Sequence, residues 1–292
     1  MPHSARVSIV VAVTLCFLLT ARASASCSSS ARGTNVASIA YGEDLLFQAL
    51  DLYAPRHVRG EPIVVFVHGG GWIQGDKAQY KALGRAFADC GIAFAAVNYR
   101  LAPAARVVEQ SRDIAEAIRW LRTAADAYGY APRRLFLMGH SAGAELAAYT
   151  VTDDESLRMA GLGKRSIAGV IAMDGASYDP TLDAKQNAGN EPWFERLAFG
   201  ANVAQWKRYD ISRRLQGDEP PFLIVHGLLD QVVSAAQPRQ LVSALRAAGD
   251  DVAYLQPRAD HSSVVSDMMT MPDDPILSAI ARFVRSGSLQ SI

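Results

Sequence analysis

The residues best suited to covalent chemistry lie in the pentapeptide GHSAG, which runs from Gly139 to Gly143. Its central serine, Ser141, follows an apolar run typical of a strand (134–138) and begins a segment typical of a helix. Small residues two positions before and after the serine permit a sharp, strained turn that raises the hydroxyl above a sheet. The pattern predicts a nucleophilic serine, and the alternative is a chance glycine-rich turn.

A nucleophilic serine needs a base, and the base needs an acid that orients it. Of the six histidines, His261 follows the last predicted strand after a short loop, so we predict that it is the base. Asp230, shortly after the preceding strand, is the predicted acid. Asp260 is the alternative acid, but its adjacency to His261 in the sequence places it poorly for reaching the imidazole. The order serine, aspartate, histidine is that of α/β-hydrolases.

The other polar residues near strand ends receive structural interpretations. His68 and His226 end strands and precede glycines, so we expect them to shape their loops. Asp174 follows a different strand and is interpreted as a loop former. His140 directly precedes the nucleophile and is expected to point away from it.

A second motif, VVFVHGGGWIQGDK (64–77), places three glycines where an apolar run ends. Acyl transfer creates a tetrahedral oxyanion, which needs backbone N–H donors about 3 Å away. We predict that Gly70, Gly71 and the amide of Ala142 form this oxyanion hole. A phosphate-binding loop is the alternative, but no G-K-[ST] sequence follows the glycines.

Buried strands and amphipathic helices alternate along the rest of the chain, which predicts a mostly parallel sheet with helices on both faces. The strands are expected at 63–67, 92–97, 134–138, 168–173, 222–226 and 252–256. Ligands of such sheets bind beyond the carboxyl ends of the strands, where every candidate residue lies.

One long connection, at about 175–221, is predicted to be an insert that walls the substrate pocket. Its aromatic residues could equally pack the insert onto the body of the domain. The candidate substrate contacts are Trp72, His140 and Trp193.

The N-terminus is typical of an exported protein. A basic residue, a short apolar stretch and small residues predict a signal peptide over 1–25, followed by a single domain over 26–292. The apolar stretch is too short for a stable membrane span, so we predict a secreted or periplasmic protein. A lipoprotein anchored at Cys27 is the alternative. Cys90 lies on the apolar side of a predicted helix, which favours a buried thiol over a disulfide.

The charges indicate which partners to expect. Lysine plus arginine equals aspartate plus glutamate, at 29 each, so the composition gives no indication of nucleic-acid binding. We predict a small-molecule ester as the substrate, with an acylated polysaccharide as a further candidate, and neither a metal nor a cofactor. No oligomeric state is predicted.

Five motifs together resemble the α/β-hydrolase esterases that carry an HGGGW oxyanion loop: HGGGWIQGDK, NYRLAP (98–103), GHSAG, HGLLD and DH. That group includes hormone-sensitive-lipase-like esterases, the BD-FAE (feruloyl and acetylxylan esterase-like) family and kynurenine formamidases. The GDK sequence and LDLYAP (50–55) are similar to the BD-FAE and formamidase members. Ala104 and Ala105 stand where the lipase-like members often have an acid and a histidine.

The resemblance covers about 45–284 and implies an α/β-hydrolase fold and a serine carboxylesterase of short-chain or aryl esters. Only about forty residues separate the signal from His68, so no large N-terminal cap is expected. Hydrolysis of N-formylkynurenine is an alternative activity, although a signal peptide argues against it. A non-catalytic binding protein on the same fold is the alternative from a different class.

Overall fold

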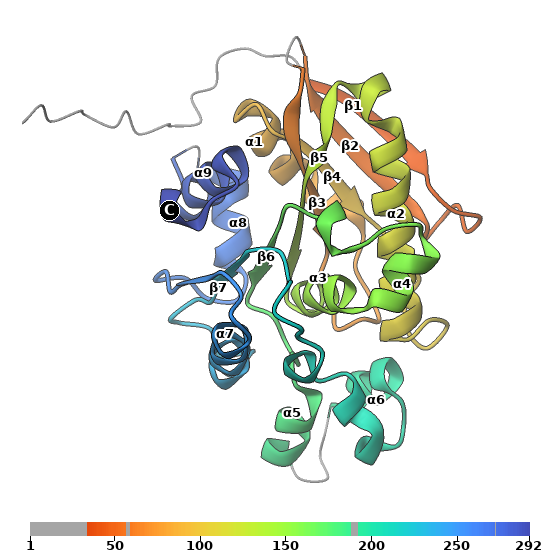
Figure 1. Cartoon of the computed structure of the whole chain (residues 1–292), viewed down its shortest axis with the longest axis vertical. Helices are drawn as coiled ribbons and strands as arrows, with labels where there is room; N and C mark the ends of the chain where they lie inside the picture. The colour runs from red at the N-terminus through yellow and green to blue at the C-terminus, as the bar shows by residue number, and fades with distance from the viewer. Residues whose placement is uncertain (1–33, 57–58, 188–191, 272) are drawn as a thin grey trace, which may run out of the picture.

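The computed structural model describes residues 34–292 except 57–58, 188–191 and 272. It contains an eight-stranded sheet. Figure 1 shows helices on both faces of this sheet. The predicted signal peptide and Cys27 lie outside the described residues. Within the described part of the chain, no helix is long and apolar enough to cross a bilayer.

The sheet has the strand order β1-β2-β4-β3-β5-β6-β7-β8, and it is mostly parallel, as predicted. The strands β1 and β2 are antiparallel to their neighbours, and all later pairs are parallel. Central strands are buried along their length because helices cover both faces. The bounds are β1 Thr34–Ala40, β2 Ala49–Pro55, β3 Glu61–Val67, β4 Ala93–Val97, β5 Tyr130–His140, β6 Gly169–Met173, β7 Phe222–Val225 and β8 Val252–Leu255.

Two apolar clusters bury the two faces of the sheet. Helices α2, α3 and α7 contribute to one cluster, and helices α1, α8 and α9 contribute to the other. Gly129 and Gly249 end α2 and α7 with positive φ, as the glycine positions in the sequence predict. The bounds are α1 Lys81–Asp89, α2 Val107–Tyr128, α3 Ala142–Thr152, α4 Asp154–Met159, α5 Pro180–Asn187, α6 Trp193–Phe199, α7 Ala236–Ala248, α8 Ser263–Thr270 and α9 Pro275–Ser286.

The long connection between β6 and β7 contains α5, α6 and two short 3₁₀ helices, Val203–Arg208 and Ile211–Arg213. Trp206 from this connection is fully buried, whereas Trp193 is 65 % exposed. The aromatic residues of the connection therefore divide between packing onto the domain and facing solvent.

The prediction for Cys90 is wrong, because Cys90 is disulfide-bonded. The residue is buried in the apolar cluster to which α1 contributes, as predicted, and directly follows the last residue of that helix, so burial did not exclude a disulfide. The two other cysteines of the sequence lie outside the described residues.

Candidate active site

The turn between β5 and α3 places Ser141 in a strained backbone conformation. Its φ is 56° and its ψ is −126°, and a positive φ is unfavourable for a residue with a Cβ atom. A Cβ atom at Gly139 would collide with the carbonyl of Gly143, and one at Gly143 would collide with the carbonyl of Val67. Both glycines of the pentapeptide are therefore required by the close approach of backbone to the turn.

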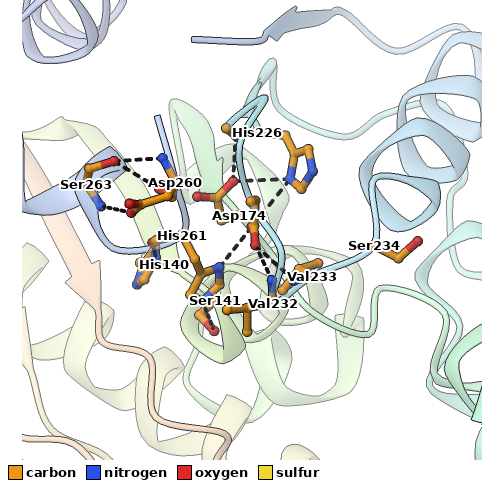
Figure 2. A network of polar contacts seen from close by, with 12 residues as sticks. His140, Ser141, Asp174, His226, Val232, Val233, Ser234, Asp260, His261 and Ser263 are labelled. Atoms are coloured by element: carbon orange, nitrogen blue, oxygen red, sulfur yellow. Dashed lines mark hydrogen bonds and ion pairs between the residues drawn. The ribbon is translucent and has the colours of Figure 1, made fainter. Parts of the chain in front are cut away.

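The structure brings the three predicted residues of the triad into one hydrogen-bonded chain, of which Figure 2 labels Ser141 and His261. His261 Nε2 lies 3.0 Å from Ser141 Oγ, and His261 Nδ1 lies 2.9 Å from Asp230 Oδ2. With the proton on Nδ1 donated to Asp230, Nε2 is free to accept the proton of the serine hydroxyl. This arrangement can activate Ser141 for attack on a carbonyl carbon.

The carboxylate of Asp230 is fully buried but remains the charged partner of the base. Its Oδ1 accepts backbone N–H groups from Val232 at 2.7 Å and Val233 at 3.0 Å. Burial acts to raise the pKa of Asp230, but the hydrogen bonds from Val233, His261 and Val232 outweigh it, and the pKa is lowered. The charge of Asp230 can therefore stabilise a protonated His261.

The alternative acid, Asp260, has a different role. Its Oδ1 accepts the backbone N–H groups of Ser262 at 3.0 Å and Ser263 at 2.8 Å, at the start of α8. Its carboxylate closes the turn that follows β8 and forms no hydrogen bond with the imidazole of His261 in the described chain.

His140 supports the base from the side. Its Nε2 donates to the backbone carbonyl of His261 at 2.7 Å, and the two ring centroids are 4.8 Å apart. Burial, together with the nearby ring of His261, lowers the pKa of His140 to about 4, so the ring is neutral at pH 7. His140 also lines the pocket, so its predicted substrate contact stays a prediction.

The glycine loop faces the nucleophile, as the oxyanion-hole prediction requires. Gly70, Gly71 and Ala142 line the same pocket as Ser141. Their amide N–H groups donate no hydrogen bond within the described chain. Ala142 is the first residue of α3, where amides lack an intrahelical acceptor. The three amides are thus available to a developing oxyanion.

Gly71→Ala tests the glycine loop. Gly71 has a φ of 60°, and an added Cβ would lie 3.4 Å from Phe194 Cδ2, which is ordinary contact. Because the methyl group would narrow the pocket beside the amides, we expect kcat to fall by about 10²-fold, close to the loss of one oxyanion donor. Steady-state kinetics with a short-chain nitrophenyl ester measures this loss.

Gly161→Ala is the matched control for this substitution, because Gly161 has a φ of 70° and open space around its Cβ position. Both variants share the backbone strain and should lose similar stability. Equal kcat values for the two variants would show that Gly71 only turns the chain.

Trp72, which follows the three glycines, anchors their loop to the body of the domain. Its side chain is fully buried, its ring packs edge-on against Phe199, and its Nε1 donates to Glu145 Oε2 at 3.0 Å. The backbone carbonyl of Trp72 accepts a hydrogen bond from Gln110 at 2.9 Å. The structure therefore gives Trp72 a supporting role, and its contact with substrate stays a prediction.

Glu145 is a residue of the site that the sequence analysis missed. It lies one turn after Ser141 and is the one charged residue of α3. A single charge in a buried helix was the available sign of a role in the site. Burial raises the pKa of Glu145 to about 8. The carboxyl group is therefore mostly neutral at pH 7 and braces Trp72 without a buried charge.

Glu145→Gln tests this protonation state. The ordinary pKa of the group is 4.5, and the folded value is about 8. The stability that the group contributes is complete below the unfolded pKa and is lost as the pH rises through the folded pKa. Glutamine keeps the acceptor for Trp72 but does not ionise, so this loss should disappear. Urea unfolding at about pH 5 and about pH 8 measures the difference, and parallel profiles for the two proteins would contradict a raised pKa.

The pocket beside Ser141 has a volume of about 820 Å³. The connection between β6 and β7 contributes Phe194 and Glu195 to its wall. The structure places Phe194, and not the predicted Trp193, in this wall, because the exposed Trp193 side chain turns outward at the start of α6. The sequence does not define where the short helix α6 begins, so it could not show which of these two adjacent aromatic side chains faces the pocket.

Two overlapping groups of described residues offer atoms that could ligate a metal. They are His140, Asp174 and His261, and Asp174, His226 and Asp230, each with ligand atoms within 4.8 Å of one another. Each group includes one member of the triad, so a metal bound there would compete with the hydrogen bonds of His261 or Asp230.

The fold and the serine turn define an α/β-hydrolase. The BD-FAE family model matches residues 50–245, which is more than half of the chain. The protein therefore belongs to the BD-FAE family, as the motifs of the sequence predict.

Curated relatives are esterases. Esterase LipC of Mycobacterium tuberculosis (strain ATCC 25618 / H37Rv) is 30 % identical over 84 % of this chain and 64 % of its own length. The isoprenylcysteine alpha-carbonyl methylesterase ICME of Arabidopsis thaliana is 28 % identical over 73 % of this chain and 52 % of its own length. The chain thus spans less than two thirds of the length of these relatives.

Solved structures show the same fold. Esterase B from Lactobacillus rhamnosis, inhibited by a tributyrin phosphonate, matches with a TM-score of 0.75 and 23 % identity. The match covers 88 % of this chain and 87 % of that chain. A truncated carbohydrate esterase from gut microbiota matches with a TM-score of 0.71 and 20 % identity. This match covers 87 % of this chain and 96 % of that chain.

Proposed function

We propose that the protein is a serine carboxylesterase that hydrolyses short-chain or aryl carboxylic esters. The observation that carries the proposal is the hydrogen-bonded chain from Ser141 through His261 to the buried Asp230. Membership of the BD-FAE family and the esterase relatives support the same activity.

In the acylation half of the reaction, His261 Nε2 removes the hydroxyl proton as Ser141 Oγ bonds to the carbonyl carbon of the ester. The carbonyl oxygen becomes an oxyanion and accepts hydrogen bonds from the amides of Gly70, Gly71 and Ala142. The protonated imidazole then gives its proton to the departing alcohol oxygen as the C–O bond breaks, which leaves an acyl group on Ser141.

Water completes the cycle. His261 removes a proton from water, whose oxygen attacks the acyl carbon through a second oxyanion in the same site. Collapse of this intermediate returns the proton to Ser141 and releases the carboxylic acid. Asp230 keeps the imidazole oriented and stabilises its charged form in both halves.

The finer parts of the proposal concern substrate and location. The likeness to the carbohydrate esterase from gut microbiota supports an acylated polysaccharide as a natural substrate. The disulfide at Cys90 supports export through the predicted signal peptide to a secreted or periplasmic location, because disulfides persist in oxidising compartments.

A substrate panel tests the proposed function: nitrophenyl acetate, butyrate and octanoate, a feruloyl ester, acetylated xylan and N-formylkynurenine. We expect the largest kcat/KM with a short-chain or aryl ester. A higher kcat/KM with N-formylkynurenine would make the protein a formamidase. No turnover of any substrate by the folded protein would favour a binding protein.

A further inference from the structure

A second carboxylate lies buried behind the triad. Asp174 directly follows β6 with a φ of 45°, and its side chain has no solvent exposure. Its Oδ1 accepts the backbone N–H of Gly227 at 2.8 Å and lies 3.1 Å from His226 Nδ1. Its Oδ2 has no hydrogen-bond partner among the described residues. An unsatisfied buried carboxylate oxygen is costly, so its place requires an explanation.

The sheet explains why this carboxylate meets the triad. Met173, the last residue of β6, pairs with Val225 at the end of β7, so the segments that follow the two strands leave the same edge side by side. The segment after β6 begins with Asp174, and the segment after β7 carries Asp230. Figure 2 shows Asp174 next to His226, in the same network of polar contacts as Ser141 and His261.

The imidazole of the base is hydrogen-bonded to Asp230 and lies near Asp174. Asp230 Oδ2 is 2.9 Å from His261 Nδ1, and an oxygen of Asp174 lies within 4.8 Å of a ring nitrogen of His261. A hydrogen bond would need this second separation to close by at most roughly 2 Å. Asp174 Oδ2 has no existing hydrogen bond to lose in that movement.

We propose that Asp174 is a positioning residue that acts as a reserve acceptor for the Nδ1–H of His261. When Asp230 does not hold the imidazole, Asp174 accepts the proton-bearing nitrogen and keeps Nε2 directed at Ser141. The inference rests on the proposed esterase mechanism, because it concerns the orientation of that base.

A double-mutant cycle tests the reserve role. Asp230→Ala removes the first acceptor and leaves room for the ring to tilt, whereas Asp174→Asn removes the charge of the second with little change in shape. We expect kcat to fall by about threefold or less in Asp174→Asn and by about 10²-fold in Asp230→Ala. The double variant should lose at least a further tenfold beyond the product of the two, within the range of coupling for contacting residues.

The matched control is Asp274→Asn, alone and with Asp230→Ala. Asp274 is equally buried and accepts a backbone N–H, from Leu277 at 2.7 Å, but it lies at the start of α9 outside the pocket wall. Its effect on kcat should simply multiply with that of Asp230→Ala. If Asp230→Ala does not fold, Asp230→Ser, whose hydroxyl can accept the amides of Val232 and Val233, replaces it in the same cycle.

The rate of Ser141 labelling by a fluorophosphonate provides a second measurement, because it depends on the base but not on the choice of ester. The labelling rate should show the same coupling between Asp174 and Asp230 as kcat does. The KM for the ester should be unchanged in these variants. Multiplicative effects of Asp174→Asn and Asp230→Ala in both measurements would overturn the inference and leave Asp174 a loop former. Absence of hydrolysis and labelling in the unmodified protein would instead overturn the proposed function.

Discussion

Replacement of Ser141 by alanine should lower kcat for ester hydrolysis by about 10⁶-fold, the size of loss seen when the nucleophile of a complete triad is removed. The fold should survive, because the hydroxyl makes one hydrogen bond within the described chain, to His261, and the backbone N–H of Ser141 still donates to the carbonyl of Met173. Kinetics with nitrophenyl butyrate and thermal melting followed by circular dichroism measure the two effects.

Ser234→Ala is the control for this loss, because Ser234 lines the same pocket and its hydroxyl accepts the backbone N–H of Ala236 in its own turn. It should keep nearly all activity. Substantial turnover by folded Ser141→Ala would show that another group carries the acyl chain.

Replacement of His261 by alanine should cost nearly as much as loss of the nucleophile, about 10⁶-fold in kcat, because without the base the hydroxyl of Ser141 stays protonated. The two losses should not add in the double variant, since each removes the same step. Kinetics of the three variants with one ester measures this. Multiplication of the two losses would contradict a shared step.

His140→Ala tests whether His140 acts in proton transfer or only supports the loop that carries His261. His140 contacts the carbonyl of His261 and not the serine hydroxyl, so its removal should lower kcat far less than His261→Ala. Equal losses would mean that the loop of His261 collapses without His140.

The triad could be predicted from the sequence because parallel strands bring their carboxyl ends to one edge of the sheet. Ser141, Asp230 and His261 each follow a different strand, and their order along the chain restricted the choice. The preference for Asp230 over Asp260 rested on geometry, and in the described part of the chain Asp230, not Asp260, is hydrogen-bonded to the imidazole.

Other parts of the site depend on contacts that strand order does not define. Phe194 enters the pocket because of the path of the β6–β7 connection, and Glu145 meets Trp72 across 73 residues of sequence. Asp174 was interpreted as a loop former because no pattern shows that its second oxygen lacks a partner. The strand β1 was missed because it is an edge strand of mostly small and polar residues, none of which is buried, so it lacks the apolar run of the central strands.

The most direct test of Ser141 as the nucleophile is mass spectrometry of the protein after reaction with a fluorophosphonate. The proposed mechanism predicts a single adduct on the peptide that contains Ser141, formed as esterase activity disappears, and no adduct in His261→Ala over the same time. An adduct on a different serine, or full loss of activity with Ser141 unmodified, would contradict it.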